Sequence, residues 1–183
     1  RISGSIQLTA LLRHVLRGGS YKYVFWMRTC QYTRASRVLR YCVYPFARLL
    51  LGRYRYRLGI SIPPETCVGS GLYIGHFGGV VVNKNSVIGR NCNISQGVTL
   101  GQSNRGSKTG CPIVGNNVYI GPGAKIIGAV RIGNDVAIGA NCVVTRDVPD
   151  HSVVVGVPGK VVSQGGSVGY CNRTDYDEHF GKF

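Results

Sequence analysis

One histidine stands where it could act in acid–base catalysis. His76 lies in the glycine-flanked segment Gly75-His76-Phe77-Gly78-Gly79, two positions after the aliphatic residue Ile74. Neutral imidazole has a pKa near physiological pH, so it can remove the proton of an alcohol whose oxygen attacks an acyl group. The spacing places His76 at a turn rather than among inward-facing residues, and it therefore predicts an exposed general base.

The element that must position His76 is a six-residue repeat. From Ile62 onward an aliphatic residue returns at every sixth position, and a glycine frequently follows it. This period matches neither a helix nor an alternating strand. It is typical of a coil of three short strands, with aliphatic side chains inside and turn residues at the corners. Residues 60–162 are therefore predicted to form an all-β parallel β-helix of roughly four to five coils. The clearest run comprises Val114, Ile120, Ile126, Ile132, Ile138 and Val144.

Two interruptions mark where the chain leaves this lattice. The first falls between Val80 and Val82, and the second between Leu100 and Val114. The second holds a polar loop, residues 102–112, which we expect to project outward. Small residues such as Cys92 and Cys142 occupy inward positions of the repeat, so they are predicted to be packing thiols.

The first third of the chain is a separate cationic segment, residues 1–59. Of the 22 lysines and arginines, 12 fall before residue 61, and the first acidic residue is Glu65. Amphipathic patterns predict helices over 6–17, 20–33 and 36–57. We expect these helices to cap the end of the β-helix, although contact with an anionic membrane surface is an alternative. No motif of a nucleic-acid-binding protein accompanies the charge. The tail, residues 163–183, suggests no role.

The cysteines and the hydropathy indicate a cytoplasmic protein that is at most peripheral at the inner membrane. The seven cysteines include no Cys-x-x-Cys pair, which argues against a zinc ribbon or a thioredoxin-type site. Their odd, scattered number favours reduced thiols. No segment approaches the roughly 18 apolar residues needed to span a bilayer, and the start lacks the pattern of a signal peptide.

Three motifs resemble those of the hexapeptide-repeat acyltransferases: Val98-Thr99-Leu100-Gly101, Ile120-Gly121-Pro122-Gly123-Ala124-Lys125 and Val155-Gly156-Val157-Pro158-Gly159-Lys160. Within that group, residues 60–162 are most similar to serine acetyltransferases and to bacterial exopolysaccharide O-acetyltransferases of the colanic-acid type. The resemblance implies a left-handed coil, a homotrimer, and acetyl-CoA as the acetyl donor without a metal. It also places His76 in the active site.

The resemblance further implies where acetyl-CoA would bind. The pantetheine arm would lie in the groove between adjacent subunits, near Gln102, Gly121, Pro122 and Ala140. Lys160 follows the Gly-Val-Pro turn, where a cation can meet a phosphate of CoA.

Two departures from the serine-specific members concern the acceptor. Ser61 stands where they carry an aspartate that orients the histidine, and Gly110 and Cys111 stand where they carry an arginine and a histidine. A backbone carbonyl, Asn83 or Glu65 would then orient the imidazole, and we favour Asn83. Ser61, Glu65 and Cys111 are the candidates for contact with the acceptor.

These departures favour a sugar hydroxyl in bacterial polysaccharide biosynthesis as the acceptor, because no charged group is left to bind an amino acid's carboxylate. Serine O-acetylation is the alternative. A non-enzymatic membrane-associated scaffold is disfavoured by the presence of His76 and Lys160. A zinc-dependent γ-carbonic anhydrase needs three histidines per metal. The β-helix offers only His76 and His151, and His151 lies in a closing turn with a structural role.

Overall fold

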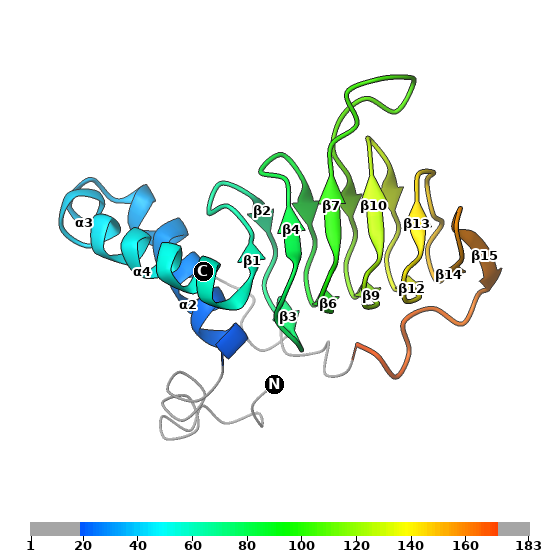
Figure 1. Ribbon diagram of the computed structural model, residues 1–183, viewed down its shortest axis with the longest axis horizontal. Coiled ribbons are helices and arrows are strands. Elements are labelled where there is room, and N and C mark those ends of the chain that lie inside the picture. The colour runs from blue at the N-terminus through cyan, green and yellow to red at the C-terminus, as the bar shows by residue number, and fades with distance from the viewer. Residues whose placement is uncertain (1–18, 172–183) are drawn as a thin grey trace.

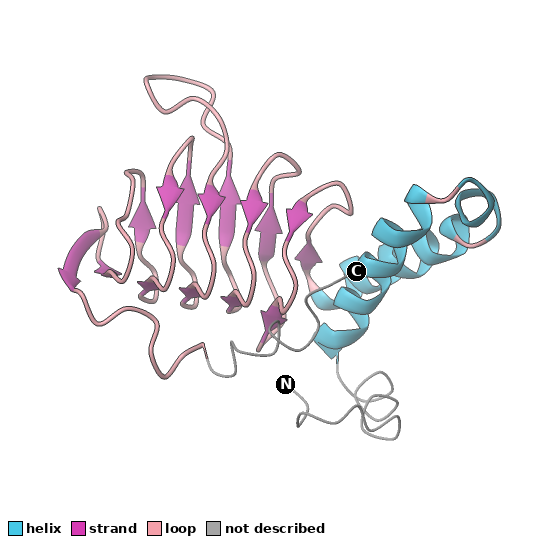
Figure 2. Cartoon of the chain, turned by 180° about the vertical axis from the view of Figure 1, so that it is seen from behind, coloured by secondary structure: helices cyan, strands magenta, loops and turns pink. Residues whose placement is uncertain are grey.

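The computed structural model describes residues 19–171 of the 183-residue chain. Three helices lie at one end of a prism of short strands, and the chain winds along the prism away from them (Figure 1). Seen from behind, the same arrangement shows loops at every corner of the prism and one long loop that projects beyond it (Figure 2). The helices precede the β-helix along the chain.

The helices are α2 (Gly19–Ala35), α3 (Arg37–Cys42) and α4 (Tyr44–Leu58). α2 confirms the predicted helix over 20–33, whereas the one over 6–17 lies outside the described residues. The predicted single helix over 36–57 is wrong, because the chain divides at Val43. Pro45 stands in the first turn of α4, where its missing N–H does no harm and its fixed φ favours a helix start. None of the described helices is long and apolar enough to cross a membrane.

The strands form three sheets, one on each side of the prism, with parallel pairing from coil to coil. β15 alone is antiparallel, and it pairs with β14. The predicted left-handed parallel β-helix is confirmed. Sheet A contains β1 (Ile60–Ser61), β4 (Val80–Val82), β7 (Thr99–Gly101), β10 (Lys125–Ile127) and β13 (Val143–Val144). Sheet B contains β2 (Cys67–Val68), β5 (Val87–Ile88), β8 (Ile113–Val114) and β11 (Arg131–Ile132). Sheet C contains β3 (Tyr73–Ile74), β6 (Asn93–Ile94), β9 (Tyr119–Ile120), β12 (Ala137–Ile138), β14 (Val153–Val155) and β15 (Lys160–Ser163).

The aliphatic residue of each repeat fills the interior of the prism. Ile120, Ile126 and Ile138 have no exposed surface, and burying each such side chain stabilises the fold by roughly 1.5–3 kcal/mol. Cys92 and Cys142 are also fully buried, as their spacing predicts. Burial raises the pKa of the Cys92 thiol to about 12. The six-residue period therefore sets both the winding and the core.

Asparagine and aspartate stack along one corner of the prism. Asn91, Asn117 and Asp135 have φ values of 57°, 56° and 55°, a left-handed conformation that these residue types tolerate. Asn91 Nδ2 donates to Asn117 Oδ1 at 3.1 Å, and Asn117 Nδ2 donates to Asp135 Oδ1 at 2.9 Å. These bonds link three successive coils.

The helices close the first coil of the β-helix, which confirms the predicted cap. The Tyr23 hydroxyl donates to the Ile62 carbonyl at 2.9 Å and accepts from the Ile62 N–H at 2.8 Å. Arg28 donates to the carbonyls of Val68 and Gly69. Leu58 packs in the same buried cluster. Polar groups that the first coil would otherwise leave unpaired thus find partners on α2.

The segment after β15 runs back along its own β-helix (Figure 1). The Ser167 N–H donates to the Asp135 carbonyl at 2.9 Å, and Asn93 Nδ2 donates to the Tyr170 carbonyl at 3.3 Å. The ring of Tyr170 stacks on Tyr119 with centroids 4.3 Å apart. Residues 164–171 therefore strap several coils together.

Candidate functional site

His76 lies in the turn between β3 and β4, and its side chain is exposed. Gly78 and Gly79 follow with φ values of 114° and 65°, which only glycine adopts without strain. Within the described part of the chain, no hydrogen bond or ion pair engages the His76 ring. The exposed position is as the sequence predicts, and the role of general base stays a prediction.

Large exposed apolar side chains flank this histidine along the chain, on β3, in its own turn and on β4. Tyr73 is 46% exposed, Phe77 54% and Val81 47%. Clustered exposed apolar groups mark surfaces that a partner or a ligand covers. In a single protomer, the exposed His76 therefore lies in a segment that also exposes apolar side chains.

The positions matched to acetyl-CoA lie along the same edge of the prism as His76. This edge joins sheet C to sheet A. Its turns follow one another in the order of His76, residues 95–98, Pro122 and Ala140. The Gly97 N–H donates to the Gly78 carbonyl, and the Asn141 N–H donates to the Pro122 carbonyl, both at 2.7 Å. One edge therefore brings together residues far apart in sequence.

Of the other acetyl-CoA candidates, Gly121 shares the turn of Pro122, whereas Lys160 and Gln102 lie elsewhere. A Cβ on Gly121 would lie 2.8 Å from the backbone nitrogen of Ala140, so close stacking requires glycine there. Lys160 is exposed at the start of β15, at the end of the prism. Gln102 lies across sheet A, beyond the other end of β7.

Asn83, Gln102 and Cys111 meet at the base of the projecting loop. Asn83 Nδ2 donates to Gln102 Oε1 at 3.4 Å, and Cys111 Sγ lies 3.7 Å from the same oxygen. Asn83 Oδ1 accepts from the Asn85 N–H at 3.0 Å. The contacts of Asn83 are therefore with this cluster, and its assignment as the group that orients His76 stays a prediction. Burial raises the pKa of the Cys111 thiol.

Glu65 also has its own partner within the protomer. Its carboxylate lies 3.4 Å from Arg34 on α2, in a pair exposed to solvent. Such exposed pairs stabilise a fold by roughly 0–1 kcal/mol. Glu65 thus connects the first coil to the helical cap, and its contact with an acceptor stays a prediction.

The loop over residues 102–112 projects outward, as predicted (Figure 1). Ser103 and Gly110 form a bridge at its base, with both N–H···O distances 2.9 Å. Lys108 Nζ lies 2.8 Å from Asp147 on a later coil. The pKa of Asp147 is lowered, chiefly by this hydrogen bond. The loop is therefore fixed at its base and along one side.

His151 lies in the turn before β14, and its structural role stays a prediction. Its φ is 57°, and its Nδ1 lies 3.9 Å from Asp135. Among the residues that the structure describes, no three His, Cys, Asp or Glu side chains are grouped so that they could hold a metal ion.

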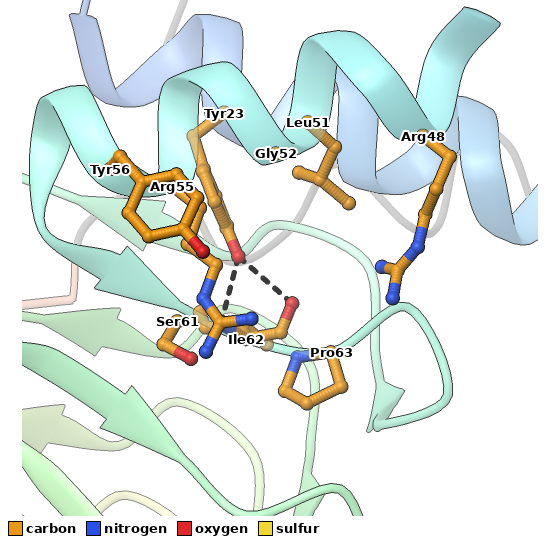
Figure 3. A pocket seen from close by; sticks show the side chains of 9 residues that line it. All are labelled: Tyr23, Arg48, Leu51, Gly52, Arg55, Tyr56, Ser61, Ile62 and Pro63. Carbon is orange, nitrogen blue, oxygen red and sulfur yellow. Dashed lines mark hydrogen bonds between the residues drawn. The ribbon is translucent and has the colours of Figure 1, made fainter. Parts of the chain in front are cut away.

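A pocket that the sequence did not single out lies between α4 and β1 (Figure 3). Its volume is about 250 Å³, and Ser61 lines it together with Tyr23, Arg48 and Arg55. A spacing of seven residues places the two arginines on one face of α4. The sequence shows the spacing of the two arginines. It does not show that β1 packs opposite them.

Residues 111–146 match the protein family described as bacterial transferase hexapeptide (six repeats). A serine acetyltransferase of Synechococcus elongatus is 44% identical over 119 residues, which are 65% of this chain and 49% of that protein. A serine acetyltransferase of Staphylococcus aureus is 43% identical over 123 residues, which are 67% of this chain and 58% of that protein. The chain thus spans about half the length of these relatives.

Solved structures show the same likeness. A serine acetyltransferase from Brucella abortus in complex with coenzyme A superposes with a TM-score of 0.71 at 29% identity, over 91% of this chain and 63% of the other. One from Neisseria gonorrhoeae in complex with serine superposes with a TM-score of 0.67 at 30% identity, over 89% and 63%.

These relatives contradict the expected sugar acceptor, and they give no support to the likeness to enzymes of the colanic-acid type. The relatives and structures just described are serine acetyltransferases. The expectation failed because it counted only Ser61, Gly110 and Cys111, at positions matched to the family. A group that recognises the acceptor can also come from another element of the fold.

Proposed function

We propose that this chain, a hexapeptide-repeat protein of the bacterial transferase kind, transfers an acetyl group from acetyl-CoA to the hydroxyl of serine. The observation that carries the proposal is the exposed His76 on the edge that also holds Pro122 and Ala140. The names of the relatives support serine as the acceptor. The complexes of similar proteins with coenzyme A and with serine support both substrates.

In the proposed reaction, His76 removes the proton from the serine hydroxyl as its oxygen attacks the thioester carbonyl carbon. Backbone N–H groups at the glycine-rich corners would stabilise the negative charge on the carbonyl oxygen. The C–S bond then breaks, and the His76 imidazolium returns the proton to the sulfur of CoA. The products are O-acetylserine and free CoA, so the proton and the acetyl group are both accounted for.

A homotrimer would complete the site. The exposed side chains of Tyr73, Phe77 and Val81 give a neighbouring subunit an apolar surface to cover. A repeated head-to-tail contact that closes on itself gives such a ring. In that arrangement, the groove for acetyl-CoA lies between adjacent subunits, and His76 opens into it.

Contact of the helical segment with an anionic membrane stays a prediction. Val38 is 71% exposed, Tyr41 80% and Leu49 71%, and the exposed Arg37 and Arg40 directly precede Val38 and Tyr41 in the sequence. Apolar and cationic groups on one surface are typical of contact with anionic lipid. Co-sedimentation with phosphatidylglycerol vesicles, compared with phosphatidylcholine vesicles, tests it.

Release of the CoA thiol in the presence of L-serine tests the proposed reaction. The wild-type protein should release CoA only when serine is present and form O-acetylserine, measured by mass spectrometry. His76→Ala should lower the rate by about 10²- to 10⁴-fold, because the general base is lost. His151→Asn is the matched control, since asparagine tolerates the left-handed φ at that turn. A wild-type protein without serine-dependent release would instead favour the scaffold.

A further inference from the structure

The pocket between α4 and β1 carries positive charge that nothing in the described chain neutralises. Arg48 and Arg55 line it, and no aspartate or glutamate does. Neither guanidinium makes a hydrogen bond or an ion pair within residues 19–171. Figure 3 shows both side chains descending from α4 toward Ile62 and Pro63. The pocket is therefore suited to an anion.

Both arginines line the pocket together with Tyr23. Burial raises the pKa of Tyr23, whereas its hydrogen bond with Ile62 and the charges of Arg55 and Arg48 lower it. The Tyr23 hydroxyl already makes two hydrogen bonds with Ile62. It therefore does not compete with a ligand for the guanidinium groups. Two planar guanidinium groups match the geometry of a carboxylate well.

A glycine in the middle of α4 lies beside open space in the pocket. Gly52 lines the pocket between the two arginines, and a Cβ built on it would meet no atom within 4 Å. Glycine inside a helix destabilises it relative to alanine by roughly 0.5–1 kcal/mol. A larger side chain at position 52 would therefore extend into the pocket.

The pocket adjoins the strand that follows the catalytic turn. Ser61 lines the pocket and pairs with Val81 on β4. The Val80 N–H donates to the Gly59 carbonyl at 3.0 Å, so the end of α4 is held against the chain that leaves the His76 turn. The pocket therefore adjoins β1, and the turn that carries His76 leads into β4, the strand that pairs with β1.

We propose that Arg48 and Arg55 bind the carboxylate of the acceptor amino acid, with the Ser61 hydroxyl as a further donor. This inference rests on the proposed function, and it supplies from the helical segment the charged partner that the projecting loop lacks at Gly110 and Cys111. Acceptors without a carboxylate would lose this interaction, so the pocket would select serine among alcohols.

The test compares L-serine with L-serinamide, in which a neutral amide replaces the carboxylate. The wild-type protein should prefer serine. Arg48→Gln and Arg55→Gln should each raise the KM for serine by about 10- to 100-fold, because each removes a charge-assisted hydrogen bond. The KM for serinamide and for acetyl-CoA should stay the same. Arg57→Gln is the matched control, since Arg57 is exposed on α4 but does not line the pocket.

A second variant tests the space rather than the charge. Gly52→Leu should fill the pocket and raise the KM for serine, while thermal unfolding shows an unchanged or higher Tm because leucine favours the helix. An unchanged preference for serine over serinamide in the Arg48→Gln/Arg55→Gln double variant would overturn the carboxylate site and leave the acetyltransferase standing. An equal rise in the KM for serine and for serinamide in the arginine variants would also overturn the carboxylate site. Absence of serine acetylation by the wild-type protein would overturn both.

Discussion

The cysteines show at the scale of single residues how burial controls reactivity. Cys92 is fully buried, with a pKa raised to about 12, whereas Cys42 and Cys67 are exposed. At pH 8 a thiol of that pKa is ionised in only about one molecule in 10⁴, and the thiolate is the reactive form. Iodoacetamide at pH 8 should therefore label Cys42 and Cys67 within minutes and Cys92 only in urea, as read by peptide mass spectrometry. Equal labelling rates for Cys92 and Cys67 in the folded protein would contradict this.

The sequence predicts the position of a single residue where that residue belongs to the six-residue repeat. The inward position of Cys92 and the exposed turn at His76 both follow from counting in sixes, and the structure has both. Arg55 escaped notice because its pocket forms only when α4 folds back onto β1. No local pattern relates a helix residue to a strand that packs against it.

At the scale of the elements, the contribution of the contact between α2 and the first coil to the free energy of unfolding can be measured. Tyr23→Phe removes a hydroxyl that pairs with both polar groups of Ile62. The buried N–H and carbonyl then lack partners, so the free energy of unfolding should fall by about 1–3 kcal/mol. Urea unfolding measures this change. Tyr32→Phe is the control, because Tyr32 is 75% exposed and its variant should unfold as the wild-type protein does.

The elements also differ in how well the sequence predicts them. The register of the sheets follows from the period, since each strand lies at the same phase of its coil, as in the pairing of Ile94 with Ile120. The break at Val43 was missed because the apolar pattern continues across it, while Pro45 sets a new helix start. Periodicity predicts which side faces inward but does not show where a helix ends.

At the scale of the whole molecule, assembly and acceptor lie beyond what one chain's sequence predicts. Residues 164–171 are held along the β-helix by individual contacts, such as the stacking of Tyr170 on Tyr119. These contacts do not repeat along the sequence, so no periodic pattern predicts them. The acceptor was misjudged for a similar reason. Its recognition was sought in the loop at Gly110 and Cys111, while the arginines that we propose for its carboxylate lie on α4.

The projecting loop and the His76 turn lie on opposite edges of sheet A, with β7 spanning the sheet between Gly97 and Gln102. If the loop of one subunit completes the site around His76 of its neighbour, two inactive variants should complement each other. His76→Ala lacks the base, and replacing residues 104–109 by two glycines removes the loop tip beyond the Ser103–Gly110 bridge. In mixed trimers one site can combine an intact histidine with an intact loop. An equal mixture, unfolded and refolded together, should therefore recover about a quarter of the wild-type thiol release. Refolding each variant alone is the control, and a mixture no more active than these would show that the site lies within one subunit.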